Sequence, residues 1–401
     1  MLLAMTYFSC VYWVLACWAV RTFFQPERRP ETAGSASYTP PVSILKPVCG
    51  IDHGAFENYA SFCRQDYPEF EIIFGVASRS DPAVQVVRRL QQAFPERRIK
   101  LIVGKPLGAN QKVGLLYYME REASYDILVL SDSDMRVRPD YLRRVVAPLA
   151  EPEVGLVTCP YRGEEALSLP AKLEALHMSV IFLPSAIVAW KLGLSFALGA
   201  TVVLRRGDLM RIGGFRAIAD YLADDFQLGS RIASLGLKTT LANYVTVSVL
   251  GRTVFADEWD REVRWARCNR VSRPREYPGI LLTLPTPLAG ALVVVSGFSP
   301  QSQQIFVLSL VLRLVSAWLV SRYAGDREAR RYLFLLPVRE MLSAAVWLAG
   351  LVGRRIVWRG REYMLEQNGR MVACSETARM DAGEEAEADI AGTGHSGGVT
   401  D

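Results

Sequence analysis

Two aspartates separated by one residue, Asp132 and Asp134, are the first side chains in this sequence that could do chemistry. Asp132 ends the short β-rich run of residues 126–132, Asp134 follows it, and both belong to the segment Ser-Asp-Ser-Asp. Carboxylates this close repel one another, and a hard divalent cation such as Mg²⁺ or Mn²⁺ would neutralise them and could bridge to a diphosphate. The alternative is a solvated turn, in which Asp and Ser are common.

A second acidic pair, Asp224 and Asp225, opens a predicted helix further along the chain. One of these carboxylates could cap the helix, since acidic side chains accept hydrogen bonds from the first backbone amides. The other could act as a general base in a site that faces a lipid.

Basic side chains complete the set. Arg261 and Arg264 fall in a predicted helix over residues 256–271 and are followed directly by Trp265. Arginines three residues apart share one helix face, so they could hold a diphosphate beside an apolar wall. Lys112 begins another predicted helix, where free backbone donors also suit phosphate. The plainer interpretations are an ion-paired surface helix and a solvated lysine.

The elements that must position these residues lie between residues 35 and 275. Short β-rich runs alternate there with helical patterns. The β-rich runs are residues 42–48, 70–77, 99–103 and 126–132, and the helical patterns are residues 54–65, 82–93 and 111–122. This alternation predicts an α/β domain with a mainly parallel sheet covered on both faces, in which ligands bind beyond the carboxyl ends of the strands. No glycine-rich dinucleotide fingerprint follows the first run, so nothing favours a dehydrogenase.

An apolar segment precedes this domain. Residues 2–20 carry no charge and are long enough to span a bilayer, and Arg21 follows them. A cleaved signal peptide would have a basic stretch before the apolar run. We therefore expect residues 1–21 to be an uncleaved anchor whose C-terminal side, with the domain of residues 35–275, lies on the cytoplasmic face of the membrane.

A second membrane region is predicted over residues 276–365. Residues 280–297 and 304–320 form an apolar pair that indicates a transmembrane hairpin, and Arg313 inside it is costly unless it faces protein or a polar cavity. Residues 333–353 are either a third span or a re-entrant or interfacial segment. Basic residues flank that segment on both sides.

Residues 168–192 are too apolar for a solvated helix and contain Pro184. One interpretation is an interfacial segment that receives a lipid hydroxyl at bilayer depth; the other is a buried core helix. His177 lies in this stretch and is more simply explained as a packed side chain.

Composition excludes other classes. Half of the 401 residues are hydrophobic and 22% are charged, which rules out a disordered or collagen-like chain. The seven cysteines form no C-x-x-C pair, so buried reduced thiols are expected. Residues 374–401 hold seven acids and one base and predict a disordered acidic tail. The basic residues follow membrane segments or converge on the diphosphate site, which argues against nucleic-acid binding.

The ordered set of motifs resembles a membrane-bound family 2-type glycosyltransferase with a GT-A fold. More narrowly, it resembles the ceramide glucosyltransferase family (glycosyltransferase family 21) and its bacterial branch, the glycosyltransferases associated with hopanoid biosynthesis. The bacterial branch implies that the membrane is a bacterial inner membrane. The matching stretches are VSILKPVCG (42–50), QDYP (65–68), SDPA (80–83), GANQK (108–112), SDSDMRV (131–137), residues 220–229, RxxRW (261–265) and WRGR (358–361).

The resemblance implies a role for each matching residue. Asp81 corresponds to an acid associated with the nucleotide, although many members have an acidic pair there. Asp132 and Asp134 correspond to the pair that holds the sugar nucleotide through Mg²⁺ or Mn²⁺, with both on the metal and Asp132 also at the donor, and Asp225 corresponds to the catalytic base. The residues at the donor diphosphate and the acceptor would be Lys112, Arg261, Arg264 and Trp265.

These roles imply an inverting transfer of one sugar from a UDP-sugar to a hydroxyl of a membrane lipid. The sequences of residues 156–163 and 196–200 are more similar to the hopanoid branch, which implies that N-acetylglucosamine is transferred to a hopanoid polyol. The alternative is transfer of glucose from UDP-glucose to ceramide. A processive polysaccharide synthase is a further alternative, but it should have more spans and usually Gln in place of Arg261. A non-enzymatic membrane scaffold would leave the carboxylates and arginines unexplained.

Overall fold

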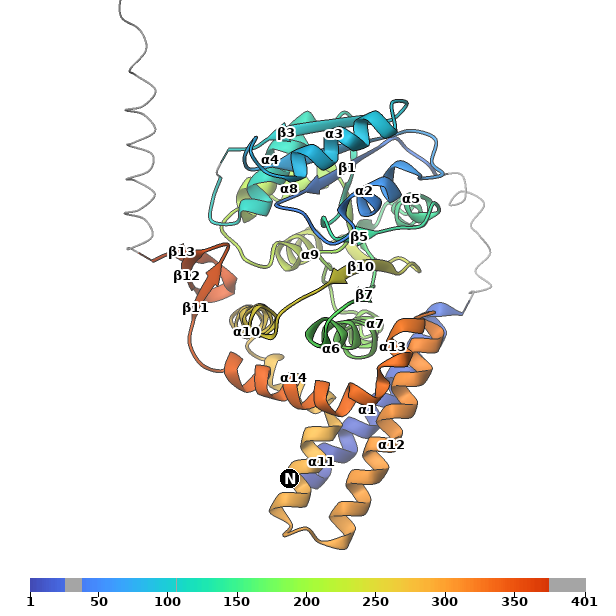
Figure 1. Cartoon of the computed structure of the whole chain (residues 1–401), viewed down its shortest axis with the longest axis vertical. Coiled ribbons are helices and arrows are strands. Elements are labelled where there is room, and N and C mark those ends of the chain that lie inside the picture. Colours follow the sequence, from blue (N-terminus) through green and yellow to red (C-terminus); the bar gives the residue numbers. More distant parts are fainter. Residues whose placement is uncertain (26–37, 106, 375–401) are drawn as a thin grey trace, which may run out of the picture.

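The computed structural model describes residues 1–25, 38–105 and 107–374, and its centre is a seven-stranded sheet (Figure 1). The strands follow the order β3-β2-β1-β4-β8-β6-β9, and β8 alone among them runs antiparallel to its neighbours. Their bounds are β1 Val42–Pro47, β2 Phe70–Val76, β3 Arg98–Val103, β4 Ile127–Leu130, β6 Val154–Thr158, β8 Val202–Arg205 and β9 Lys238–Leu241. The predicted mainly parallel α/β domain is confirmed.

Helices cover both faces of this sheet, which is why β1, β2 and β4 are buried along their whole length. One face packs against α2 (Ala55–Cys63), α3 (Ala83–Ala93) and α5 (Tyr141–Val146). The other packs against α4 (Gln111–Glu122), α8 (Arg206–Arg211) and α9 (Asp224–Ser234). The predicted helices over residues 54–65, 82–93 and 111–122 correspond to α2, α3 and α4.

The strand order reverses at β1. The chain adds β2 and then β3 on one side of β1, and returns to place β4 on the other side. The carboxyl ends of β1 and β4 therefore lie side by side, and the amide of Ser131 donates to the carbonyl of Leu45 at 3.1 Å. Such a switch point is where open α/β sheets bind ligands.

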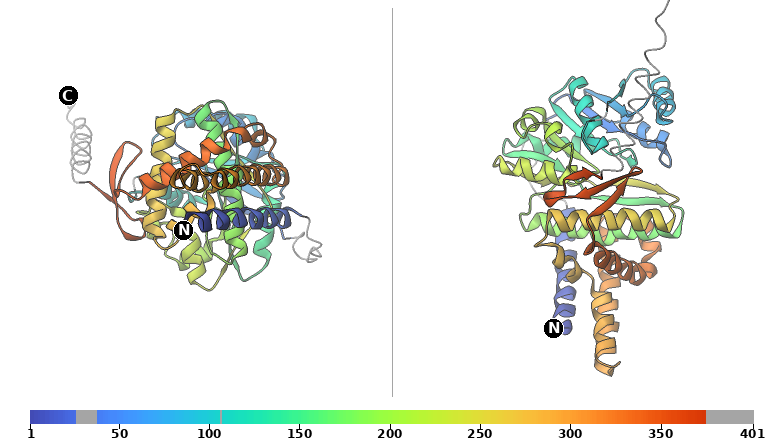
Figure 2. Two further views of the ribbon diagram at one scale, coloured as in Figure 1. Left: turned by 90° about the horizontal axis from the view of Figure 1, so that it is seen from below. Right: turned by 90° about the vertical axis from the view of Figure 1, so that its left-hand side faces the viewer.

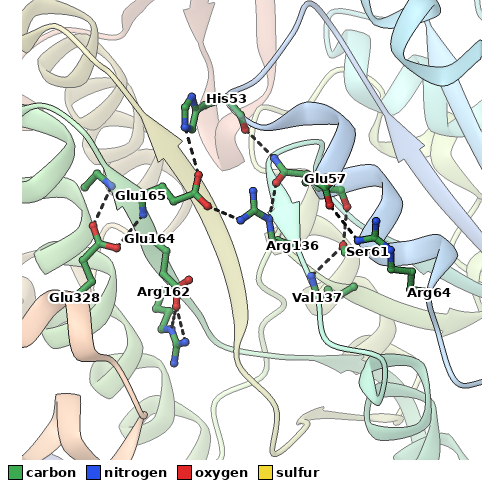
Figure 3. A network of polar contacts seen from close by, with 12 residues as sticks. His53, Glu57, Ser61, Arg64, Arg136, Val137, Arg162, Glu164, Glu165 and Glu328 are labelled. Carbon is green, nitrogen blue, oxygen red and sulfur yellow. Dashed lines mark hydrogen bonds and ion pairs between the residues drawn. The ribbon is translucent and has the colours of Figure 1, made fainter. Parts of the chain in front are cut away.

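A smaller sheet, β5-β10-β7, lies beside the first (β5 Met135–Arg136, β7 Tyr161–Ala166, β10 Thr246–Gly251). A polar network fixes its outer strands (Figure 3). Arg136 forms an ion pair with Glu165, which also contacts His53 Nε2 at 3.3 Å, and the Arg136 Nε donates to Asn58 Oδ1 at 3.0 Å. The network matters because β5 begins directly after Asp134.

Four helical stretches within the described residues are long and apolar enough to cross a membrane. They are α1 (Leu2–Phe24), α12 (Pro300–Tyr323), Leu169–Lys191 and Leu333–Gly350. A short helix, Tyr277–Thr283, and α11 (Pro285–Val295) could form a fifth, but they meet at 79°. The first arm of the predicted hairpin is thus bent, and its crossing stays a prediction. In Figure 1, α1, α11 and α12 project together from the α/β domain.

The other apolar helices run crosswise to this bundle (Figures 1 and 2). Leu169–Lys191 consists of α6 (Leu169–His177), one π-helical turn (Met178–Phe182) and α7 (Leu183–Lys191). It lies alongside α10 (Phe255–Ser272), the helix predicted over residues 256–271. Beneath both runs α14 (Leu336–Gly350), joined to α12 through α13 (Arg327–Arg331).

Arg313 faces protein, as its cost in a membrane segment requires. Its guanidinium is fully buried, pairs with Glu340 of α14, donates to the carbonyl of Val180 at 2.8 Å and stacks on Trp13. Glu340 also accepts the amide of Thr286 at 3.1 Å. One ion pair therefore joins α1, α11, α12, α14 and the π-helical turn.

The described chain ends in a three-stranded antiparallel sheet formed by β11 (Arg355–Trp358), β12 (Arg361–Leu365) and β13 (Met371–Ala373). This sheet lies against α10 and close to α9 (Figure 1). The predicted acidic tail falls outside the described residues except for Cys374.

Candidate active site

Lys112 is the centre of a charged cluster at the carboxyl edge of the large sheet. Its Nζ lies 2.7 Å from Asp132 Oδ1 and 3.2 Å from Asp224 Oδ2. Burial alone would lower the pKa of Lys112, but Asp132 and Asp224 outweigh it and raise that pKa above its ordinary value. The structure thus brings together three residues that are distant in the sequence, and Lys112 stays charged between two carboxylates.

Asn110 fixes the position of the helix turn that carries Lys112. Asn110 caps α4, since its Oδ1 accepts the amide of Val113 at 3.2 Å. The Nδ2 of the same side chain donates to the carbonyl of Tyr221 at 2.8 Å, in the loop that leads into α9. One asparagine therefore fixes the start of α4, which carries Lys112, against the loop that carries the acidic pair.

Asp225 lies next to this cluster. Its Oδ2 accepts the amide of Gly199 at 3.0 Å, and its Oδ1 accepts the amide of Phe226. A β-carbon placed on Gly199 would lie 3.5 Å from Asp225 Oδ2, 3.7 Å from Asp132 Oδ2 and 3.7 Å from Lys112 Nζ, so the three groups surround this glycine. Burial and the Asp224 carboxylate raise the pKa of Asp225 to about 6, with Lys112 opposing them. A carboxyl with that pKa suits a general base near neutral pH.

Asp134 occupies a different position from Asp132. Ser248 Oγ donates to its Oδ2 at 2.5 Å, and the amide of Val249 donates to its carbonyl at 3.0 Å. Burial and the nearby Asp132 carboxylate raise the pKa of Asp134 to about 7. A bound cation beside Asp134 would favour the charged form of this carboxyl and offset both causes.

Lys46 supplies one buried cation from β1. Its Nζ donates to the carbonyl of Asp132 at 2.7 Å and lies over the ring of Phe62. Burial lowers the pKa of Lys46 to about 7, opposed by Asp134 and Asp132. The Lys46 side chain thus holds the backbone of the turn after β4, and this contact positions Asp132 and Asp134.

The residues present fit a divalent cation, provided that the donor supplies further ligands. A buried carboxylate oxygen of Asp52 has no hydrogen-bond partner among the described residues, and this carboxylate helps to raise the pKa of Asp134. Oxygen ligands of this kind suit Mg²⁺ and Mn²⁺. Over the described part of the chain, however, no three His, Cys, Asp or Glu side chains form a metal site by themselves.

Asp81 lies at the start of α3. Its carboxylate accepts the amide of Gly50 at 3.1 Å and that of Ala83 at 2.9 Å. Asp81 therefore joins the loop after β1 to a helix N-terminus, and its role in binding the nucleotide stays a prediction.

The two arginines of the RxxRW segment diverge. Arg261 pairs with Glu258 and with Glu174 of α6, whereas the Nη1 of Arg264 donates to the carbonyl of Val357 at 3.4 Å. The side chain of Trp265 is 41% exposed. None of these contacts joins the three residues to the Lys112 cluster in the described part of the chain, so diphosphate binding by Arg261, Arg264 and Trp265 also stays a prediction.

His177 lies in the same layer as Arg261. Its Nδ1 lies 3.2 Å from Arg339 Nη2, and that guanidinium holds both oxygens of Glu262 at 2.7 Å. This packed position agrees with the plainer interpretation of His177.

Sequence reasoning missed the parts played by Lys46 and Asp52. A charged residue inside the apolar run of residues 42–48 was the available signal for Lys46, because a lysine is almost never buried without a partner. Nothing comparable distinguished Asp52, whose importance comes from its proximity to Asp134 in the folded chain.

Comparisons with known proteins agree with this geometry. The sequence profile of glycosyl transferase family 21 matches residues 1–371. Ceramide glucosyltransferase 1 of Caenorhabditis elegans is 25% identical over 343 residues, which cover 83% of this chain and 73% of that protein. Ceramide glucosyltransferase 3 of the same organism is 23% identical over 348 residues, which cover 84% and 75%.

A solved structure shares the fold. The mannosyltransferase PcManGT from Pyrobaculum calidifontis, in complex with GDP-Man and Mn²⁺, superimposes with a TM-score of 0.50 at 19% identity, covering 86% of this chain and 97% of that one. The likeness supports the GT-A fold predicted for residues 35–275.

Proposed function

The chain belongs to glycosyl transferase family 21, and on that premise we propose that it transfers one sugar from a UDP-sugar to a hydroxyl of a membrane lipid. The observation that carries the proposal is the cluster around Gly199, where Lys112, Asp132 and Asp225 meet at the switch point of the sheet. A cation site beside a carboxyl with a pKa of about 6 suits a reaction that stabilises a leaving diphosphate and deprotonates an alcohol.

In this mechanism Asp225 accepts the proton of the lipid hydroxyl. The hydroxyl oxygen forms a bond to the anomeric carbon while the bond from that carbon to UDP breaks on the opposite face, so the configuration inverts. Lys112 balances the charge of Asp132 and Asp224. A divalent cation held by Asp132 and Asp134 would stabilise the diphosphate as it leaves.

We infer that the crosswise helices place this site at the membrane surface. Val338, Met341 and Leu348 of α14 are each more than half exposed, while Arg339 and Glu340 on the same helix face protein. A helix with one exposed apolar face fits the membrane interface, which supports an interfacial or re-entrant position for residues 333–353. Basic residues flank the helix at both ends, as expected if both ends stay on the cytoplasmic side.

Two donor and acceptor pairs are candidates for this reaction. The names of the two C. elegans relatives favour glucose and ceramide. The sequences of residues 156–163 and 196–200 favoured N-acetylglucosamine and a hopanoid polyol, and no comparison supports that choice over glucose and ceramide. We therefore propose glucose transfer to ceramide first and hexosamine transfer to a hopanoid polyol second.

Mass spectrometry of the lipid products tests the proposal. The detergent-solubilised full chain would receive Mn²⁺, UDP-glucose or UDP-N-acetylglucosamine, and ceramide or a hopanoid polyol. A single hexose on ceramide supports the first pair, and a single hexosamine on the polyol supports the second. A polymer would favour a processive synthase, and no lipid product with any pair would contradict the proposal. Excess EDTA should abolish product, and Mn²⁺ should restore it.

We expect the transfer rate to fall at acidic pH with a midpoint near 6. A base works only when deprotonated, so protonation of Asp225, whose pKa is about 6, removes activity as the pH falls, tenfold per unit once the pH is well below 6. The measurement is kcat from pH 4.5 to 8.5 at saturating donor. Asp224→Asn is the control, because loss of this neighbouring charge should move the midpoint to lower pH. A midpoint that does not move would assign the titration to another group.

A further inference from the structure

The C-terminal sheet covers the two loops that lead into the charged cluster. The amide of Leu222 donates to the carbonyl of Gly369 at 3.1 Å, and the amide of Met371 donates to the carbonyl of Asp220 at 2.7 Å. Asp220 Oδ1 in turn accepts the amide of Ala109, in the loop before α4. Strand β13 therefore lies against the loop before Asp224, and that loop lies against the one before Lys112.

The same sheet is fixed to α10. Arg267 Nη1 donates to the carbonyl of Arg355 at 2.7 Å, and Arg264 donates to the carbonyl of Val357 in the same strand. Apolar side chains of Ile356 and Tyr363 pack with Cys268 beneath these contacts. The hairpin β11–β12 is thus held in place along its length, and its turn has a defined position over the site.

Arg359 occupies that turn. Strands β11 and β12 pair up to Trp358 and Arg361, which leaves a two-residue turn with Arg359 at φ +51° and Gly360 at φ +77°. Turns with two positive φ angles favour Asn-Gly, and a long side chain such as Arg is uncommon at the first position. An unfavourable backbone conformation at a fixed turn points to a use for the side chain.

The Arg359 side chain reaches the start of α4. Its Nη1 donates to Gln111 Oε1 at 3.2 Å, and its guanidinium lies over the ring of Trp358. Both of these contacts are with neutral groups, and Gln111 directly precedes Lys112. By contrast, Arg261 pairs with two carboxylates.

Charge in the site calls for another cation. Four aspartates, Asp132, Asp134, Asp224 and Asp225, face two lysines, Lys112 and Lys46, so a diphosphate would add negative charge to a site that already has an excess of it. A divalent cation offsets part of this charge, and a guanidinium suits phosphate oxygens because of its planar, multiple donors. Arg359 has the chemistry and the position to supply them.

We propose that Arg359, at the tip of the C-terminal sheet, is a donor-binding residue that contacts the diphosphate of the nucleotide sugar. The proposal rests on the function proposed above. It assigns a substrate contact to the C-terminal sheet, which is separate from the seven-stranded sheet at whose edge the aspartates lie. In the described structure, Gln111 holds the guanidinium at the edge of the site until the diphosphate arrives.

Calorimetric titration of the detergent-solubilised full chain with UDP, in the presence of Mn²⁺, tests this role. The variant is Arg359→Asn, since Asn-Gly is the preferred pair for such a turn and should preserve or raise thermal stability. Loss of a charge-assisted contact should weaken UDP binding by about 10- to 100-fold and leave uridine, which has no phosphate, unaffected. Arg359→Lys should recover part of the affinity for UDP.

Arg354→Ala is the matched control, because it removes the same charge from an exposed position beside the same sheet. Its affinity for UDP should equal that of the wild type. Unchanged UDP affinity in Arg359→Asn, or equal losses in both variants, would overturn the role of Arg359. A wild-type chain that binds neither UDP nor a UDP-sugar would instead overturn the proposed function itself.

Discussion

Replacement of Asp225 by Asn should lower the rate of sugar transfer by about 10²–10⁴-fold while UDP-sugar binding changes little. Asparagine has nearly the same shape and keeps an oxygen for the amide of Gly199, but it cannot accept the proton of the attacking hydroxyl. The measurements are kcat from lipid product formation and the Kd of the UDP-sugar by titration. A variant that retains turnover would remove Asp225 from the role of base.

Asp224→Asn separates the base from its neighbour. Asp224 pairs with Lys112, so its loss should alter donor affinity and the pH profile more than the maximal rate. If the two variants lost the same share of kcat with unchanged pH profiles, the acidic pair would act as one electrostatic unit and no single base could be assigned.

The elements of the catalytic domain were predictable because each is a local pattern. A buried strand such as β4 (Ile127–Leu130) is a continuous apolar run, and a start signal such as Asn110 marks the beginning of α4. The association of Lys112 with Asp132 was predictable in outline, since both were expected at the carboxyl ends of strands or the starts of helices.

The contacts of Arg261 were not predictable in the same way. A pair of arginines on one helix face is compatible with diphosphate binding and with ion pairing, and the choice depends on Glu174, which lies 87 residues away in sequence. The position of the C-terminal sheet could not be predicted either, because no local pattern in residues 355–373 specifies that β13 pairs with the loop at Asp220.

Replacement of Glu340 by Ala should produce the largest loss of stability. The variant leaves the guanidinium of Arg313 fully buried and without its carboxylate, among apolar helices. Removal of one partner of a buried ion pair typically costs about 3–5 kcal/mol, and in a membrane region Arg313 has no water to compensate it. Thermal unfolding of the purified protein in detergent would measure the loss as a lower Tm.

Arg322→Ala is the matched control on α12, because Arg322 is exposed and lies over the ring of Trp318. Loss of an exposed charge of this kind should change the free energy of unfolding by about 1 kcal/mol or less.

The double variant Arg313→Met, Glu340→Leu tests whether the unpaired charge causes the instability and whether the ion pair also matters for activity. If an unpaired charge is the cause, removal of both charges should restore most of the Tm, because apolar side chains of similar volume often replace buried ion pairs without loss. If the pair also fixes the geometry where α1, α11, α12 and α14 meet, the double variant should regain its Tm but lose transfer activity, since α14 also holds α10 through Arg339 and Glu262. A single Glu340→Ala variant as stable as the wild type would contradict both explanations.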